Sequence, residues 1–365
     1  RLVSDWSSDV CSSDLATHSI PDCVGFAIDT PHGLIVHTGD YKFDNTPVDG
    51  RKPDYARLAS YGQRGVRLLL GDSTNADKAG WTGSEAIIEP AFERVFQKAK
   101  GRILVATFAS LISRIQQVVH VCHKYGRRIA IIGYTMKEYV KLAEKMGYLK
   151  IPEGMIIDSG KISSIEPHKL VLMVTGSQGE PSAVLSKLST GRHKFLSVQE
   201  EDTVILSSHP IPGNEEMVYR TVNRLIERGA DVVYDPLDTV HVSGHACQEE
   251  MKLMLSLVQP EFLMPVHGEL RHLVQHAKLA TQVGIAPSNI ILAENGHIIE
   301  VDKYSVRRGE RVPGGYVFVD GSGVGDIGRA VIRDRETLAR DGFILVSVNV
   351  DKNSGKLRGE PEIIS

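Results

Sequence analysis

Short apolar runs alternate with amphipathic runs along almost the whole chain. Nine runs rich in aliphatic and β-branched residues predict strands, among them "VRLLLGD" (66–72) and "KLVLMVTG" (169–176). Several contain a continuous apolar run, which is typical of strands covered on both faces. The other predicted strands lie at 23–28, 34–40, 102–107, 128–133, 202–208, 231–235 and 261–268.

Segments with an apolar residue every three or four positions lie between these strands and predict helices. Ser84 precedes the first of them, and we expect its side chain to cap that helix. After residue 296 the pattern indicates short strands and tight turns. The alternation predicts an α/β protein with mainly parallel sheets. The predicted helices lie at 85–99, 111–126, 135–147, 215–229, 247–258 and 271–284.

The first 15 residues do not fit this pattern. The stretch "VSDWSSDVCSSDL" repeats a Ser-Ser-Asp unit and has neither a strand period nor a helix period. We interpret residues 1–15 as an artefact foreign to the protein and leave them out of the fold prediction. A disordered natural terminus is the alternative. On the first interpretation the natural protein begins upstream of Ala16, and this chain is truncated.

The composition is that of an ordinary globular protein. The chain has 365 residues, of which 42% are hydrophobic and 24% charged, enough for two domains. The formal net charge of -3 gives no overall attraction to nucleic acid, so a polyanion site would have to be a local patch. No apolar run reaches the roughly 18 residues of a membrane span, and no signal-peptide pattern opens the chain.

The four cysteines are scattered and form no CxxC pair. This distribution is typical of a reducing compartment and disfavours both a disulfide framework and a cysteine-based zinc site. We therefore expect a cytoplasmic protein without a membrane partner.

Polar clusters follow several predicted strands, and His18, Asp40 and His267 each lie at a loop start or a strand end. Since the functional groups of open α/β sheets collect where strands end, these three side chains are candidates for one shared site. Imidazole and carboxylate are ligands that Zn²⁺ prefers. The sequence therefore predicts a metal site. The clusters are "HTGDYKFD" (37–44), "GDSTNAD" (71–77), "TGSQGEP" (175–181) and "PVHGEL" (265–270).

Hydroxyl-bearing residues supply a second candidate feature. Ser243 and Gly244 lie just before the helix predicted at 247–258, and Ser207 and Ser208 form a neighbouring pair at a strand end. Hydroxyls and free N–H groups at a helix N-terminus suit a phosphate oxygen. We expect these residues to form a phosphate cradle.

Taken in order, eight motifs identify a family. To the four clusters above the chain adds "THSIPD" (17–22), "TFAS" (107–110), "SSHPIPGNE" (207–215) and "HVSGHA" (241–246). On these motifs the chain resembles the metallo-β-lactamase superfamily of the β-CASP type, and within it the bacterial ribonuclease J family. The resemblance covers Ala16 to Ser365.

The resemblance implies an α/β fold: a metallo-β-lactamase-like αββα sandwich, incomplete here, with an inserted β-CASP α/β domain. Residues 16–84 would form the first part of the sandwich, and 241–325 its return. Residues 85–240 would form the β-CASP domain, and 326–365 the start of a linker and C-terminal region.

The resemblance also assigns roles to single residues. His18, Asp40 and His267 match zinc ligands, and Asp40 matches the carboxylate that bridges two zinc ions. Asp72 matches the acidic residue of the first β-CASP motif, beside the metals, and His245 matches the second motif. The matches to the region that holds the RNA phosphates are His241, Ser243, Gly244 and Ser110.

These roles imply a zinc-dependent ribonuclease with two Zn²⁺ per active site in the intact family member. It would act on single-stranded RNA as a 5′-to-3′ exonuclease and as an endonuclease, in RNA processing and decay. His245 is a candidate proton donor to the departing 3′-oxygen, because its residue type suits that task. The alternative is that His245 only orients the phosphate or Asp72. The family also forms homodimers and homotetramers, so we expect one of these states.

One departure from the family pattern is serious. The principal zinc motif, HxHxDH, is absent, and no two of the 14 histidines are two positions apart. Most ligands for both metals and the first strands of the sandwich are therefore missing. We interpret the chain as an internal fragment that is itself inactive. The alternative function is a catalytically inactive fragment that only binds RNA or a partner.

Three further histidines have a structural or a functional interpretation. His272 and His276 are four apart on one predicted helix, and we favour helix packing over metal binding because no HExxH motif surrounds them. His209, in "SSHPIPGNE", is a candidate for a position near the substrate path.

Overall fold

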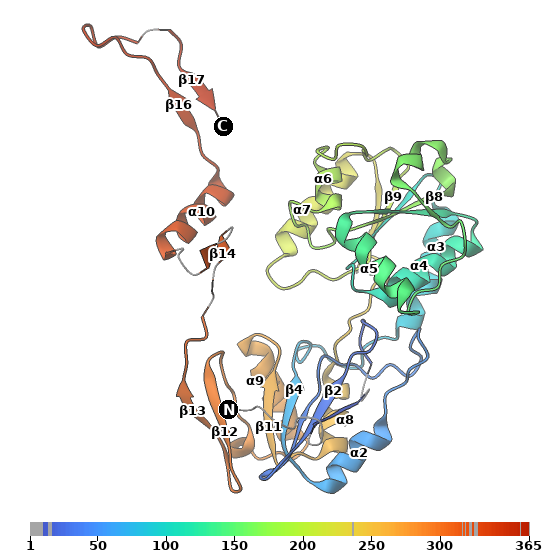
Figure 1. Cartoon of the computed structure of the whole chain (residues 1–365), viewed down its shortest axis with the longest axis vertical. Helices are drawn as coiled ribbons and strands as arrows, with labels where there is room; N and C mark the ends of the chain where they lie inside the picture. Colours follow the sequence, from blue (N-terminus) through green and yellow to red (C-terminus); the bar gives the residue numbers. More distant parts are fainter. Residues whose placement is uncertain are drawn as a thin grey trace. The chain divides into compact units, whose positions relative to one another are not determined.

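The computed structural model describes residues 10–13, 17–235, 237–315, 317, 319–320, 323–324, 328–357 and 359–364. The chain divides into two compact units. The first comprises Arg1–Ala293 with Ile299–Arg308, and the second Glu294–Ile298 with Gly309–Ser365. Both sheets described next belong to the first unit (Figure 1).

The first sheet has five strands in the order β1-β2-β3-β4-β11. Strands β2 (Gly25–Thr30) and β3 (Gly33–His37) form an antiparallel hairpin. Strand β4 (Val66–Asp72) lies parallel to β3, and β11 (Phe262–Val266) lies parallel to β4, although almost 200 residues separate β4 from β11. The long segment between them therefore leaves the sheet and returns to it.

Strand β1 (Val10–Ser13) lies within the residues that were left out of the fold prediction. These four residues pair antiparallel with β2. The outer edge of β2 presents backbone N–H and C=O groups that an extended chain can satisfy whatever its side-chain period. The interpretation of residues 1–15 as foreign sequence stays a prediction.

Apolar side chains cover both faces of this sheet. On one face Leu69 and Leu263 join a core with α2 (Tyr55–Arg64), α8 (Gln248–Val258) and α9 (Leu270–Gln282). On the other face Leu68 and Phe262 pack with residues of the hairpin formed by β12 (His297–Val301) and β13 (Val306–Arg311). Alternate residues of β4 and β11 thus enter different cores, which explains their continuous apolar runs.

The second sheet has six parallel strands in the order β10-β9-β5-β8-β6-β7. In the central strand β5, Ile103 and Val105 enter one core and Leu104 and Ala106 the other. Helices α3, α4 and α5 supply the first core and α6 and α7 the second (Figure 1). The strands are β5 (Ile103–Ala106), β6 (Arg128–Ile132), β7 (Ile156–Ile157), β8 (Leu170–Val174), β9 (Thr203–Leu206) and β10 (Asp231–Tyr234). The helices are α3 (Ile88–Lys98), α4 (Ile112–Lys124), α5 (Tyr134–Lys145), α6 (Val184–Ser189) and α7 (Glu215–Glu227).

The predicted elements are confirmed as elements, with small shifts at their ends. Each of the nine predicted strands overlaps a strand, and each of the six predicted helices overlaps a helix. Ser84 accepts a hydrogen bond from the Ala86 N–H at 3.1 Å and so caps the short 3-10 turn before α3, as expected. The α/β class with mainly parallel sheets is therefore confirmed.

Besides parts of β12 and β13, the described residues of the second unit form four short strands and one helix. They are β14 (Val319–Asp320), β15 (Gly323–Val324), α10 (Arg329–Asp341), β16 (Leu345–Ser347) and β17 (Glu362–Ile364). Among the described residues of the whole chain, no helix combines the length and hydropathy that crossing a membrane would require.

Candidate metal centre and its surroundings

Four side chains meet at one edge of the first sheet. Three come from strand ends, and the fourth comes from the crossover segment that leads from β10 to α8. Asp40, Asp72, His245 and His267 each offer a ligand atom, and these atoms lie within 4.8 Å of one another. Asp72 ends β4, and Asp40 and His267 follow the parallel strands β3 and β11. Two carboxylates and two imidazoles match the ligands that Zn²⁺ prefers. The donor set therefore fits a zinc ion.

Asp72 is the buried centre of this group, with 1% of its surface exposed. Its carboxylate accepts hydrogen bonds from His245 Nδ1 at 2.7 Å and from the Thr74 N–H at 3.0 Å. Burial alone would raise the pKa of Asp72, but the hydrogen bonds from His245 and His267 hold that pKa well below its usual range. Asp72 is therefore a carboxylate, and its negative charge orients the two imidazoles.

His267 is held in a left-handed backbone conformation, with φ of 55°. Its Nδ1 lies 3.3 Å from Asp72 Oδ1, 3.4 Å from Asp40 Oδ1 and 2.9 Å from Thr74 Oγ1. The hydrogen bond with Asp72 raises the pKa of His267 despite partial burial. A non-glycine residue keeps this unfavourable backbone angle only where its surroundings enforce it. Such strained residues are common at functional sites.

His18 lies beside the group, although its nitrogens are not among the four convergent ligand atoms. The His18 and His245 ring centroids are 5.0 Å apart. His18 Nδ1 lies 2.7 Å from the Gly244 carbonyl oxygen and donates to it, and Nε2 lies 3.2 Å from Ser19 Oγ. A metal-ligating histidine commonly donates one N–H to a backbone carbonyl, which leaves the other nitrogen for the ion. Burial lowers the pKa of His18 and so favours the neutral ring that a metal requires.

The turn that contains Ser243 and Gly244 is fixed against the same centre. Asn75 Nδ2 donates to Ser243 Oγ at 2.8 Å and to the His245 carbonyl at 3.0 Å. Gly244 faces His18 so closely that a Cβ at this position would lie 2.6 Å from His18 Cε1. The turn is thus placed by side chains of the "GDSTNAD" segment.

Three residues that position this site, Thr74, Asn75 and Glu250, were not predicted from the sequence. Thr74 and Asn75 belong to a cluster that we singled out only for Asp72. Glu250, fully buried, accepts hydrogen bonds from the N–H groups of Phe43, Thr82 and Cys247 at 2.7 to 2.9 Å. An acidic residue three positions into a helix is a capping signal that could have identified Glu250.

His241 and Ser110 are not joined to the metal group. His241 packs against His209, with ring centroids 4.7 Å apart, and its Nδ1 lies 3.5 Å from Arg114 Nη1. Ser110 is half-buried in the loop between β5 and α4, where its carbonyl accepts from the Ile112 N–H at 2.9 Å. Within the described residues, no hydrogen bond links the Ser110 side chain to the other candidate phosphate-binding residues.

The expected contribution of Ser207 and Ser208 to a phosphate cradle is wrong. Both residues are buried, and their hydroxyls donate to the carbonyls of Val240 at 2.6 Å and Ser177 at 3.3 Å. A buried hydroxyl engaged with a backbone carbonyl has no free donor for a ligand. The pair stabilises the chain near β9 instead.

The packing role favoured for His272 and His276 is confirmed. His272 Nδ1 accepts from the Glu269 N–H at 3.1 Å and so caps α9. His276 is 2% exposed, and its Nδ1 lies 2.9 Å from Ser73 Oγ. Burial lowers the pKa of His276 to about 4. This neutral, buried ring packs beneath the strand end that carries Asp72.

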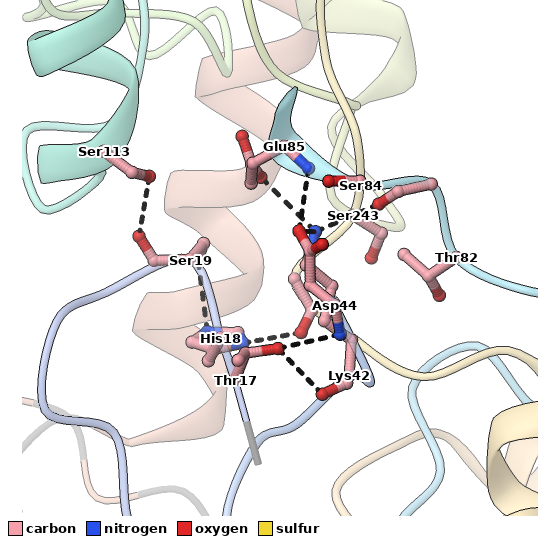
Figure 2. A network of polar contacts seen from close by, with 12 residues as sticks. Thr17, His18, Ser19, Lys42, Asp44, Thr82, Ser84, Glu85, Ser113 and Ser243 are labelled. Atoms are coloured by element: carbon pink, nitrogen blue, oxygen red, sulfur yellow. Dashed lines mark hydrogen bonds and ion pairs between the residues drawn. The ribbon is translucent and has the colours of Figure 1, made fainter. Parts of the chain in front are cut away.

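A cavity of about 380 Å³ adjoins His18. Its walls come from the loops at 17–23 and 42–52, with Lys42 among them, and from the inserted segment, with Ser113 and Tyr148 among them. Figure 2 shows how Thr17, His18 and Ser19 lie between Lys42 and Ser113. The Ser113 hydroxyl donates to the Ser19 carbonyl at 3.4 Å. The cavity is therefore bounded by both parts of the first unit.

Replacing Gly244 by alanine is expected to weaken zinc binding about tenfold, because the new methyl group displaces His18 from the Gly244 carbonyl. Competition with a chromophoric zinc chelator measures the affinity. Gly83→Ala is a matched control in the crossover segment from β4 to α3 and should leave the zinc affinity unchanged. Its added Cβ meets side-chain atoms of Val242 and Ile87 at 3.2 and 3.4 Å. Equal zinc affinity in the Gly244→Ala variant and the unaltered chain would contradict the role given to His18.

Three family models match successive parts of the chain. "Ribonuclease J, beta-CASP domain" matches residues 100–225, and "Zn-dependent metallo-hydrolase RNA specificity domain" matches residues 229–291. "Ribonuclease J C-terminal domain" matches residues 330–365. The first match falls on the six-stranded sheet, and the second contains His241, His245 and His267.

Curated relatives are similar over nearly the whole chain. Ribonuclease J 1 of Streptococcus pyogenes is 42% identical over 96% of this chain and 62% of its own length. Ribonuclease J2 of Bacillus subtilis is 41% identical over 100% of this chain and 66% of its own length. Ribonuclease J of Thermus thermophilus is 43% identical over 91% of this chain and 58% of its own length. The chain thus spans less than two thirds of these relatives.

A solved structure supports the fold alone. It is a protein of unknown function from Enterococcus faecalis, with a TM-score of 0.51 and 15% identity over 80% of this chain and 66% of that one. Together, the successive family matches and the relatives of about 40% identity show that this chain has the metallo-β-lactamase fold with a β-CASP insert and belongs to the bacterial ribonuclease J family.

Proposed function

We propose that this chain carries the RNA-binding surface and part of the metal centre of a zinc-dependent ribonuclease that acts on single-stranded RNA in the cytoplasm. The observation that carries the proposal is the convergence of Asp40, Asp72, His245 and His267 from distant parts of the sequence. In the intact enzyme, 5′-to-3′ exonuclease and endonuclease activities would share this centre.

In this proposal Asp40, His267 and His18 hold zinc, and two ions occupy the centre of the intact enzyme. Zinc, when bound, supplies a Lewis acid that stabilises negative charge developing at the scissile phosphate. Asp72 holds His245 and His267 through their Nδ1 atoms, as the distances of 2.7 and 3.3 Å indicate. The described residues thus supply the carboxylates that fix the ligand geometry.

His245 is the candidate proton donor to the departing 3′-oxygen. Its Nδ1–H donates to the Asp72 carboxylate, so in the protonated ring Nε2–H is free to donate to substrate. The same contact also suits a residue that only orients the phosphate, and both roles stay open. Ser243, Gly244, His241 and Ser110 are the proposed phosphate-binding residues, and the cavity beside His18 is where we place the strand.

A second candidate function is RNA binding without cleavage. It is favoured by the absence of any HxH pair among the 14 histidines, because the family's principal zinc motif is then missing from the chain. Both functions require the chain to bind single-stranded RNA. They differ in metal content and in cleavage.

Two measurements on the purified chain separate the candidates. We expect about one zinc per chain by elemental analysis, because Asp40, His267 and His18 are the proposed zinc ligands. We also expect binding of a 5′-monophosphorylated single-stranded RNA. Cleavage of that RNA would support the nuclease, whereas binding without cleavage would support the second candidate. Failure to bind either zinc or RNA would overturn both.

We further propose that the protein forms a homodimer or homotetramer. Light scattering coupled to gel filtration tests this directly. The side chains of Phe343, Ile344, Leu345 and Val346 in the second unit are all more than half exposed, which is typical of a surface that a partner covers. A monomer at micromolar concentration would contradict the proposal for this chain.

A further inference from the structure

A fully buried arginine of the inserted domain contacts both crossover segments, the one from β4 to α3 and the one from β10 to α8. Arg114, on α4, is 0% exposed. Its Nη2 donates to Glu85 Oε2 at 2.7 Å on the segment that enters the insert, and its Nη1 donates to the Val240 carbonyl at 3.0 Å on the segment that leaves it. Nη1 also donates to Ser207 Oγ at the end of β9. One guanidinium thus holds both connections.

The charges around Arg114 balance within the buried region. Lys42 Nζ lies 3.6 Å from Asp44 Oδ2 and 3.6 Å from Glu85 Oε1, so two cations face two carboxylates. All four residues are at most 4% exposed. Figure 2 shows Lys42, Asp44 and Glu85 beside the segment that carries Thr17 and His18. Glu85 Oε1 has no hydrogen-bond partner, so the Glu85 carboxylate depends on Arg114 for its side-chain hydrogen bond.

Arg114 also reaches the first residue of the "HVSGHA" motif. Its Nη1 lies 3.5 Å from His241 Nδ1. The two Nη1 hydrogens are directed to Ser207 Oγ and the Val240 carbonyl, so the contact with His241 is electrostatic. A lone pair at Nδ1, not an N–H, suits the positive charge that it faces, and the proton of the neutral ring then sits on Nε2. Burial, followed by the positive charge of Arg114, lowers the pKa of His241 well below its usual value, which keeps the ring neutral.

We propose that Arg114 is a positioning residue of the RNA site: it binds Glu85 and the Val240 carbonyl, and its positive charge faces His241 Nδ1. In this way it fixes the Nε2–H tautomer of His241 and presents that N–H to an RNA phosphate. The RNA part of this inference rests on the proposed function. The tautomer part does not, because it follows from the contacts of Arg114 alone. Lysine cannot replace the guanidinium, since a single ammonium cannot span the same three partners.

The direct test is nuclear magnetic resonance of the chain labelled with ¹⁵N-histidine. Long-range ¹H–¹⁵N spectra distinguish protonated from unprotonated ring nitrogens. We expect His241 Nδ1 to be unprotonated and Nε2 protonated in the unaltered chain, and a mixture of tautomers in Arg114→Met. A protonated His241 Nδ1 in the unaltered chain, or the same single tautomer in Arg114→Met, would overturn the inference.

RNA affinity is the second readout, measured by fluorescence anisotropy with a 5′-monophosphorylated ten-nucleotide RNA. Arg114→Met is expected to weaken binding about tenfold, the effect of losing one well-oriented hydrogen bond to a charged group. Arg114→Lys, which keeps the charge and serves if the methionine variant fails to fold, should also weaken binding. Affinity unchanged in the variant that folds would overturn the positioning role.

Arg102→Lys is the matched control. Arg102 is also a buried arginine of the insert, at 5% exposure, but it pairs with Asp202 at 2.5 to 2.8 Å and contacts neither crossover segment. The Arg102→Lys substitution should lower the stability of the chain and leave the His241 tautomer and the RNA affinity unchanged. Equal loss of affinity in this control would mean that any buried arginine of the insert has the same effect, which would contradict a specific role for Arg114.

If the unaltered chain binds no RNA, the proposed function fails, while the histidine spectra still decide the role of Arg114.

Discussion

Replacing Asp72 by asparagine is expected to lower the zinc affinity of the chain by about 10- to 100-fold. The substitution keeps the shape of the side chain but removes the negative charge that His245 and His267 face at 2.7 and 3.3 Å. An amide NH₂ can also point a proton at an imidazole N–H or at the metal, where the carboxylate offers only acceptors. Both effects turn the two imidazoles away from the ion.

Zinc affinity by chelator competition measures this effect, with Asp77→Asn as the matched control. Asp77 follows the same strand, but it is 42% exposed and pairs with Arg271 at 2.7 Å, outside the metal group. The control should bind zinc as the unaltered chain does. If Asp72→Asn also binds zinc with unaltered affinity, the convergent group is not a metal centre, whatever the family of the chain.

The central strands of this protein were predictable because they are buried on both faces. Runs such as 66–72 and 169–176 are apolar at successive positions, and the structure divides these positions between two cores. Helix α2 was missed because its few large apolar residues are separated by Arg57, Ser60 and Gly62, and α6 because six residues are too short for a periodic signal. Helix α10, in the second unit, was missed for its charged sequence.

The metal group was predictable in part, for a topological reason. Asp40, Asp72 and His267 each follow a strand of one parallel set, so their meeting follows from the sheet. The contacts of Thr74, Asn75 and the buried charges were not predictable. Lys42 and Arg114 have the residue types that are normally exposed, and their partners Glu85 and Val240 lie tens of residues away in the chain. Only the three-dimensional path of both crossover segments brings these groups together.

Acidification from pH 7.5 to pH 5 is expected to cost the fold about 2 kcal/mol through His276 alone. The pKa of His276 falls from 6.5 in the unfolded chain to about 4 in the folded one, because the ring is buried. Above pH 7.5 the ring is neutral in both states and does not affect stability. Between the two pKa values the unfolded chain binds a proton that the folded chain does not, so stability decreases as the pH falls.

Urea unfolding at several pH values measures this slope in the unaltered chain and in His276→Asn. The asparagine side-chain amide can replace Nδ1 as the partner of Ser73 Oγ, because it both donates and accepts, and it does not titrate. The variant is therefore less stable than the unaltered chain at pH 7.5, because it is smaller, but it should lose about 2 kcal/mol less on acidification. Leu279→Val on the same helix is the control for lost packing, since it lowers stability by a similar amount at every pH. Parallel pH profiles for His276→Asn and the unaltered chain would show that His276 takes up its proton in the folded state, and the buried neutral ring beneath Asp72 would then be the wrong description.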